Sequence, residues 1–171
     1  STNFSYLSGF SEPCAVMLLI PNREQGECVL FCRDKDPLRE TWDGLRLGPI
    51  EAKQALALDD AFPIDDIDDI LPGLLEGKSH IYYSAGKDKA FDKQLIQWVD
   101  EVTLDKESDS EPCCEQVDLD HLLAELRLIK SAAEIKLMRK AADISAEAHC
   151  RAMRFCQPGQ YEYQLQAEIE H

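Results

Sequence analysis

The sequence predicts an α/β fold in which helices pack against a mixed β-sheet. Two patterns support this fold class. Over roughly the first 115 residues, short apolar runs alternate with segments whose apolar residues recur every three or four positions. From residue 117 onward the pattern is helical throughout. Strands that alternate with helices are typical of a sheet covered by helices, so we expect the helical tail to belong to a separate unit.

Three segments are predicted as strands. Cys14–Pro21 and Glu27–Arg33 are short, apolar and partly β-branched, as buried strands are. Asn22–Gly26 has the residues of a turn, so the two strands that flank it are predicted to form a β-hairpin. Ser79–Ser84 is the third strand and is rich in β-forming residues.

Three helices are predicted in the same part of the chain. Pro49–Leu58 begins with a proline, which the first helical turn tolerates. Pro63–Gly77 carries acidic residues in its first turn, and Pro72 is predicted to end or kink it. The third helix, Asp88–Val102, places an apolar set on one face. That set is Phe91, Leu95, Trp98, Val99 and Val102.

Three polar or glycine-containing segments are predicted to lie outside these elements. After a loop at Asp34–Pro37, Arg39–Pro49 is expected to be extended because its two glycines interrupt a helix. The acidic run Asp59–Asp69 lacks the spacing of a calcium-binding loop and is predicted as a solvated helix face. Asp105–Glu115 is polar and contains a proline, which indicates an exposed loop or linker.

The helical tail begins with Val117–Ile129. Ser131 and Glu134 then form the S-x-x-E pattern of a capping box, so a new helix is expected to begin at Ser131. A last helix is predicted from Tyr161. Because the alanine-rich apolar face of the helix from Ser131 needs a partner to bury it, we expect the chain to be cut partway into a second domain. The predicted parts are a domain at 1–116, a linking helix at 117–130, and the first helices of a truncated domain at 131–171.

The charge balance excludes some classes of partner. The chain has 18 Lys and Arg residues against 33 Asp and Glu residues, a formal net charge of -15. Such a surface repels phosphate groups, so neither nucleic acid nor an anionic membrane is expected as a partner. No run approaches the roughly 20 apolar residues that span a bilayer, and no signal peptide is recognised. Seven cysteines without a regular spacing favour reduced thiols and a cytoplasmic location.

The residues alone predict neither a metal site nor a catalytic group. Cys28 and Cys32 share a strand face but lie ~13 Å apart at the rise of a strand, too far to bind one zinc ion. Neither a G-x-S-x-G nucleophile elbow nor a phosphate-binding glycine loop occurs. The histidines form no H-E-x-x-H or H-x-H pair. They are His80, His121, His149 and His171.

Four stretches resemble one family of proteins. The stretch "ELRLIKSAAEIKLMRKAADISAEAHCRAM", followed by "PGQYEYQLQAEIEH", is similar to the start of the catalytic domain of the pita-bread metallopeptidases. That family includes aminopeptidase P, prolidase, creatinase and methionine aminopeptidase. "NFSYLSGFSEPCAVMLLIP" and "ETWDGLRLGP" resemble the Y-L-[ST]-G-F-x-E-P and E-x-W-x-G-x-R-L-G segments of the aminopeptidase P group. The resemblance covers nearly the whole chain and departs at Leu45, where the family has a basic residue.

The resemblance implies a creatinase/prolidase-type N-terminal domain, followed by the first helices of a pita-bread domain. Its implied function is the N-terminal portion of a bacterial-type Xaa-Pro aminopeptidase, which releases the first residue of peptides with proline second. The family holds two metal ions, commonly Mn²⁺, between two Asp, one His and two Glu residues. Those ligands lie beyond the point where this sequence stops. The resemblance therefore implies that this chain alone is non-catalytic and serves assembly, as a homodimer or homotetramer, and substrate access.

Two residues are predicted to bind substrate. The resemblance implies that Trp42 lines the substrate cleft of a neighbouring subunit, as an apolar wall for a proline ring or the next residue; the alternative is a half-buried aromatic residue in a strand. Arg46 is predicted to pair with a carboxylate of a peptide end or a neighbouring subunit, the alternative being a surface ion pair. For the whole protein, two alternatives stay open: a prolidase, which takes only Xaa-Pro dipeptides, and a non-enzymatic relative that binds peptides or proteins.

Overall fold

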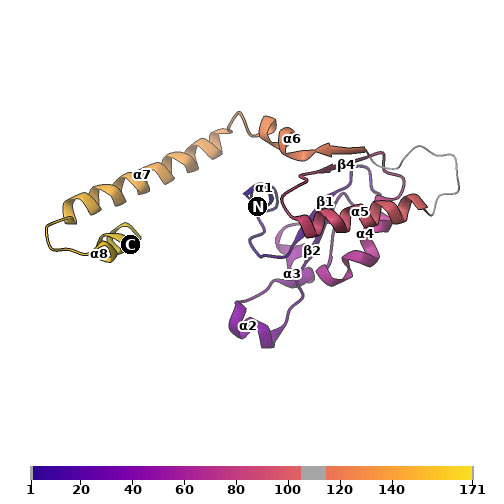
Figure 1. The fold of residues 1–171 in the computed structure, drawn as a ribbon, viewed down its shortest axis with the longest axis horizontal. Helices are drawn as coiled ribbons and strands as arrows, with labels where there is room; N and C mark the ends of the chain where they lie inside the picture. The colour runs from indigo at the N-terminus through magenta and orange to yellow at the C-terminus, as the bar shows by residue number, and fades with distance from the viewer. Residues whose placement is uncertain (1, 105–114, 171) are drawn as a thin grey trace. The chain divides into compact units, whose positions relative to one another are not determined.

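The structure, a computed structural model, describes residues 2–104 and 115–170 (Figure 1). The chain divides into two compact units, at residues 1–121 and 122–171. The boundary between them falls inside helix α6 (Leu119–Leu126). The predicted loop Asp105–Glu115 lies outside the described residues, apart from Glu115, which begins a strand.

A three-stranded sheet forms the centre of the first unit. Its strands are β1 (Val16–Leu19), β2 (Cys28–Cys32) and β3 (Asp60–Pro63), in the order β1-β2-β3. β1 and β2 are antiparallel, with Val16 opposite Phe31, which confirms the predicted hairpin. β3 joins β2 in parallel, with Val29 opposite Asp60. The sheet is therefore mixed, as the sequence predicts.

The structure corrects the prediction that the acidic run Asp59–Asp69 is a helix face, because only part of the run is helical. It begins with β3 and continues through a 3-10 turn η1 (Ile64–Asp66) into α4 (Ile67–Leu75), which does not end at Pro72. The strand is held by contacts from the distant hairpin. Asp59 Oδ2 accepts hydrogen bonds from the backbone N–H groups of Glu27 and Cys28, each at 2.9 Å. Such non-local contacts leave no trace in the local pattern.

A second sheet pairs β4 (His80–Tyr83) with β5 (Glu115–Asp118) in parallel. β5 corrects the prediction of a helix over Val117–Ile129, because the first residues of that segment continue a strand and the helix α6 begins only at Leu119. Pairing with β4 supplies the strand geometry, and Asp118 Oδ1 accepts from the N–H of Asp120 where the helix starts. The described residues thus contain two sheets where the sequence pattern predicts one.

Helices cover both faces of β2, whose side chains alternate between two cores. Val29 and Phe31 pack in one core with apolar residues of α4 and α5 (Lys89–Leu104). Leu30 and Cys32 face the other core, with α3 (Gly48–Ala55) and Phe10, next to α1 (Thr2–Ser8). These four side chains are fully buried, while Cys28 at the start of the strand is partly buried. The alternation makes β2 the strand around which the unit is organised.

Helix α2 (Pro37–Asp43) corrects the prediction that Arg39–Pro49 is extended. Asp36 Oδ1 accepts from the N–H groups of Leu38 and Arg39 at 3.1 and 3.2 Å, which caps the helix at its start. Gly44, with φ +89°, ends it and donates its N–H to Glu40 O at 3.2 Å. A glycine just past a helix is a common stop signal. The glycine therefore marks the end of a helix and does not exclude one.

The second unit contains a long helix, α7 (Ala132–Phe155), followed by α8 (Glu162–Glu170). The predicted capping box is confirmed: Glu134 N–H donates to Ser131 Oγ at 3.3 Å, and Ser131 N–H donates to Glu134 Oε2 at 2.7 Å. Arg151 of α7 pairs with Glu168 of α8 at 2.9 Å. No helix within residues 2–104 or 115–170 has the length and apolar character needed to cross a membrane.

Candidate functional site

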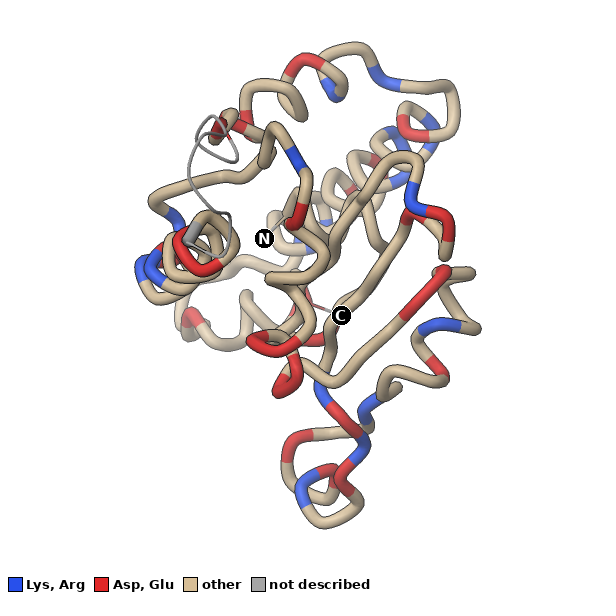
Figure 2. The backbone as a smooth tube through the Cα atoms, turned by 90° about the vertical axis from the view of Figure 1, so that its right-hand side faces the viewer, with Lys and Arg blue, Asp and Glu red and all other residues tan. Residues whose placement is uncertain are grey.

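The candidate site is a segment that projects from the first unit. Residues 34–47, here called the arm, leave the end of β2, form α2 and return to the start of α3. Two perpendicular views show the arm standing away from the sheet (Figure 1), and Figure 2 shows that it carries both basic and acidic residues. Because a projecting segment is available to other molecules, the arm is where a surface role of this unit is expected.

The arm presents apolar side chains to solvent. Leu38 is 83% exposed, Trp42 is 88% exposed and Leu45 is 87% exposed. Trp42 lies in the last turn of α2, so the alternative of a half-buried aromatic residue in a strand is wrong. Large exposed apolar side chains that share one projecting segment often mark a binding surface. The geometry is compatible with the predicted contact between Trp42 and a substrate or partner.

The side chain of Arg46, in contrast, does not face solvent. It is buried, and Nη1 donates to the backbone oxygen of Asp34 at 3.3 Å while Nη2 lies 3.4 Å from Asp43 Oδ2. Both partners belong to the arm. The guanidinium therefore closes the arm on itself, and its ion pair joins a buried arginine to the half-exposed carboxylate of Asp43. Its contact with a peptide carboxylate stays a prediction, while its contacts with Asp34 and Asp43 lie within the arm.

Glu12 is a third residue of this region, and the sequence reasoning missed it. Its side chain is only 13% exposed. Oε1 accepts from the N–H of Leu47 at 2.7 Å, and Oε2 lies 3.4 Å from Nη2 of Arg33. A signal for it exists in the segment "YLSGFSEP", which carries a glutamate in an otherwise uncharged stretch. Such an isolated charge usually has a specific partner when the surrounding segment packs against a core.

The two ends of the arm lie close together, near Lys35 and Gly48; this place is called the root of the arm. Gly48 has φ +68°, a conformation that favours glycine, and a Cβ atom there would lie 3.0 Å from Lys35 Cγ, so the close approach adds to that preference. Lys35 also pairs with Glu51 of α3. Burial, together with the charges of Glu12 and Asp34, raises the pKa of the Cys32 thiol to about 11. That thiol is therefore protonated at neutral pH and is no nucleophile.

Metal binding finds no donor set in the part of the chain that the structure describes. No group of three or more His, Cys, Asp or Glu residues there is placed to hold a metal ion. Cys28 and Cys32 are free thiols at opposite ends of β2, and His149 Nδ1 makes a hydrogen bond of 2.7 Å with the backbone oxygen of Ser145. The described residues therefore do not fit the two-metal centre that the resemblance implies.

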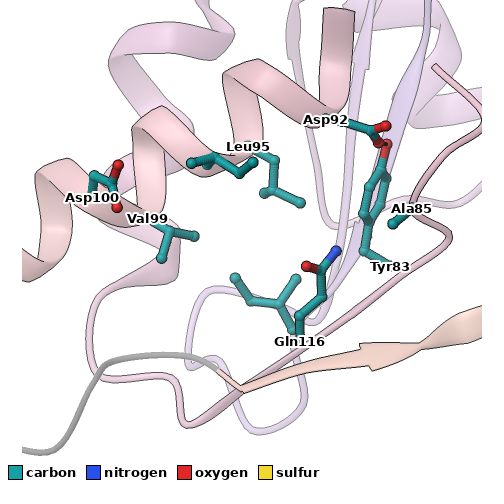
Figure 3. A pocket seen from close by; sticks show the side chains of 9 residues that line it. Tyr83, Ala85, Asp92, Leu95, Val99, Asp100 and Gln116 are labelled. Atoms are coloured by element: carbon teal, nitrogen blue, oxygen red, sulfur yellow. Dashed lines mark hydrogen bonds between the residues drawn. The ribbon is translucent and has the colours of Figure 1, made fainter. Parts of the chain in front are cut away.

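A cavity of about 300 Å³ lies between α5 and the β4–β5 sheet (Figure 3). Tyr83 points toward Asp92 at one end of it, and the hydroxyl donates to Asp92 Oδ1 at 2.8 Å. Asp92 Oδ2 also accepts from the N–H of Gly86 at 3.0 Å. Burial and the carboxylate of Asp92 raise the pKa of Tyr83 well above its usual range. The fold thus favours the neutral phenol, which is the form that donates to Asp92.

Tyr83→Phe is expected to make the free energy of unfolding fall less steeply as the pH rises into the alkaline range. The pKa of Tyr83 is higher in the folded chain than the unfolded value of about 10, so its contribution is present below pH ~10 and is lost as the pH rises further. At neutral pH the variant should lose ~1 kcal/mol, because Asp92 loses a donor. Urea unfolding at neutral pH and between about pH 9 and 11 measures both effects. Tyr82→Phe, on the same strand, is the control, and an unchanged alkaline decline in Tyr83→Phe would contradict the assignment.

Comparisons with known proteins assign the two units to two parts of one family. Residues 1–82 match the family model "Aminopeptidase P, N-terminal domain", and residues 136–171 match "Metallopeptidase family M24". The chain is 36% identical over 168 residues to the Xaa-Pro aminopeptidase of Haemophilus influenzae, covering 98% of this chain and 36% of that protein. It is 34% identical to the Xaa-Pro aminopeptidase of Escherichia coli, covering 100% of this chain and 39% of that protein.

Solved structures agree with these matches. Pseudomonas aeruginosa aminopeptidase PepP superposes with a TM-score of 0.91 and 54% identity, covering 99% of this chain and 38% of that chain. A zinc-substituted E. coli aminopeptidase P with bound product superposes with a TM-score of 0.88 and 34% identity, covering 100% and 39%. The chain spans less than two fifths of the length of the curated relatives given above. It belongs to the aminopeptidase P family of M24 metallopeptidases and matches the N-terminal part of its members.

Proposed function

We propose that this chain forms the N-terminal part of a metal-dependent Xaa-Pro aminopeptidase, which releases the first residue of peptides that have proline second. The observation that carries the proposal is the similarity of 98% or more of the chain to proteins named Xaa-Pro aminopeptidase, with both family matches in the expected order. By itself the chain is proposed to be non-catalytic.

We also propose the domain boundaries 1–116, 117–130 and 131–171. The boundary between the compact units at residues 121–122 supports a division in this region.

The proposed cofactor is a pair of Mn²⁺ ions in the catalytic domain. Membership of a metallopeptidase family supports a metal, and the zinc-substituted E. coli relative supports a divalent ion. Two such ions activate water and polarise a scissile carbonyl. The described residues of this chain are proposed to contribute no ligand to that centre. Their role in the enzyme is to shape the access of peptides to it.

Trp42 is the residue through which this chain is proposed to meet the substrate, within a homodimer or homotetramer. The indole is a flat apolar surface at 88% exposure on a projecting arm, which suits a proline ring or the residue after it. Arg46 is proposed to support that contact from inside the arm. The net charge of -15 supports peptides over nucleic acid or an anionic membrane as partners. The free thiols of Cys14, Cys150 and Cys156 support a reducing compartment such as the cytoplasm.

Peptide hydrolysis by the full-length protein tests the proposed activity. The protein, loaded with Mn²⁺, is assayed on an Xaa-Pro-Yaa tripeptide and on an Xaa-Pro dipeptide, with this 171-residue chain as the control. We expect the full-length protein to cleave the tripeptide and to lose that activity with a chelator, and the 171-residue chain to cleave neither peptide. Cleavage of the dipeptide alone would favour a prolidase, and cleavage of neither would favour a non-enzymatic binding protein.

Trp42→Ala in the full-length protein is expected to raise KM for the tripeptide about tenfold, equivalent to ~1.4 kcal/mol, with kcat changed less than about threefold. The physical reason is the loss of apolar contact with a bound peptide, away from the metal centre. Trp42→Phe should retain part of the effect because it keeps an aromatic face. Leu19→Ala, which removes an exposed side chain outside the arm, is the matched control. An unchanged KM in Trp42→Ala would refute a substrate contact.

A further inference from the structure

We propose that Glu12 is a positioning residue that fixes the arm and thereby sets where Trp42 is presented. The inference rests on the proposed function for the role of Trp42 toward substrate, but the fastening of the arm itself rests only on contacts within the first unit. Glu12 belongs to the segment between α1 and β1, outside the arm. Its position is separated from Leu47 by 35 residues of sequence.

The carboxylate of Glu12 bridges the two ends of the arm. One oxygen accepts from the N–H of Leu47, the last residue of the arm, at 2.7 Å. The other oxygen lies 3.4 Å from Nη2 of Arg33, immediately before the arm begins. The side chains of Glu12 and Arg33 are 13% and 19% exposed. The 2.7 Å bond from Leu47 has the length of a strong hydrogen bond to a charged acceptor, whereas the 3.4 Å pair with Arg33 is longer and acts mainly through charge at low exposure. Glu12 thus contacts both ends of the arm at once.

A second contact closes the same root next to the first. Arg46, beside Leu47 in the chain, reaches back to the backbone oxygen of Asp34 at 3.3 Å. Its side chain is 8% exposed. The polar contacts of Glu12 and Arg46 therefore meet at one place, where the arm joins the body of the unit. Surface loops whose ends are held close behave as compact pieces of structure.

Hydrogen bonds at both ends of α2 connect the held ends of the arm to Trp42. Asp36 caps the start of α2, and Gly44 ends it with a backbone hydrogen bond to Glu40. The helix thus moves as one body, and Trp42 lies in its last turn. Without the Glu12 carboxylate, the partly buried Arg33 side chain and the Leu47 N–H lose an acceptor. The root is then expected to open, which displaces the helix and the indole with it.

Two variants of Glu12 in the full-length protein test the inference. Glu12→Ala removes both contacts, whereas in Glu12→Gln the amide oxygen can still accept from Leu47. We expect the Leu47 amide to exchange hydrogen at least tenfold faster in Glu12→Ala than in the wild type, with most protection kept in Glu12→Gln. Glu27→Ala is the matched control, because it removes a comparable carboxylate bond of 2.7 Å, to the N–H of Asn22, outside the arm.

A double-mutant cycle with Trp42→Ala tests whether Glu12 acts through Trp42. We expect Glu12→Ala to raise KM for the Xaa-Pro-Yaa tripeptide about fivefold, with kcat changed less than about twofold, and to add nothing in a Trp42→Ala background. Additive effects on KM would overturn the inference. Unchanged exchange of the Leu47 amide in Glu12→Ala would also overturn it, whatever Trp42 does.

The two proposals fail in different ways. If Trp42→Ala leaves KM unchanged, the substrate role of Trp42 fails. Faster exchange of the arm amides in Glu12→Ala still upholds Glu12 as the residue that fixes the arm in that case. If Trp42→Ala raises KM and Glu12→Ala does not, the substrate role stands and the positioning role of Glu12 is refuted.

Discussion

Gly26→Ala is expected to lower the free energy of unfolding by ~3 kcal/mol. Gly26 ends the β1–β2 turn with φ +110°, and a Cβ atom there would lie 2.2 Å from Cβ of Asp59. Asp59 would have to move. Its carboxylate accepts from the N–H groups of Glu27 and Cys28 at 2.9 Å, so the same displacement would break the contacts that join the hairpin to β3. Strain and lost hydrogen bonds therefore add at one position.

Two other glycines separate these causes. Gly86→Ala has a comparable φ of +85° with nothing within 4 Å of the added methyl group, so it should lose only ~1 kcal/mol. Gly73→Ala lies in α4, also without a neighbour within 4 Å, and should gain up to ~1 kcal/mol because alanine favours a helix. Urea unfolding followed by circular dichroism measures all three. A loss in Gly26→Ala no larger than in Gly86→Ala would refute the close contact with Asp59.

Trp98→Ala is expected to lower the free energy of unfolding by ~3–5 kcal/mol, because it opens a cavity in the core between α4 and α5. The side chain is 3% exposed, and its ring meets Phe91 edge-on at a centroid distance of 5.6 Å. Nε1 also donates to Asp68 Oδ1 at 3.0 Å, which links the two helices. Trp98→Phe should lose ~1–2 kcal/mol, since it keeps most of the packing but not the hydrogen bond.

Trp42→Ala provides the control within the same chain. Trp42 and Trp98 are its two tryptophans, and Trp42 is 88% exposed. Its replacement should change the stability by less than ~0.5 kcal/mol. Circular dichroism follows the unfolding because each variant changes the tryptophan fluorescence. Equal losses in the two variants would mean that Trp42 is buried in solution, which would contradict its exposed position on the arm.

Elements with a strong local signal were predictable. The hairpin of β1 and β2 follows from two apolar runs around turn residues, and the structure pairs Val16 with Phe31 as such a hairpin requires. The inward face of α5 follows from its spacing, and Leu95, Trp98 and Val102 are buried. The capping box of Ser131 and Glu134 forms with both hydrogen bonds. In each case the signal lies within the segment itself, as an apolar spacing or a cap, so the local pattern predicts the element even where its packing partners are distant, as for α5.

Elements that depend on distant contacts were not predictable in this way. β3 is acidic and short, and it is a strand because it pairs with β2 and because Asp59 binds the hairpin backbone. β5 carries the sequence Glu115–Asp118, whose strand geometry comes from pairing with β4. In the arm, Gly44 suggests an extended segment when taken alone, whereas the cap at Asp36 turns the residues before it into a helix.

For the site, the amino-acid order was enough to single out Trp42 and Arg46, through the segment that resembles the aminopeptidase P group, and to separate an α/β part from a helical tail. The order of residues did not predict which of these side chains is exposed and which is buried. Trp42 faces solvent while Arg46, close by in the chain, is buried, because α2 ends at Gly44 between them and Glu12, from another segment, holds Leu47 next to Arg46. Contacts between residues far apart in sequence leave no local periodicity, so only the folded arrangement reveals them.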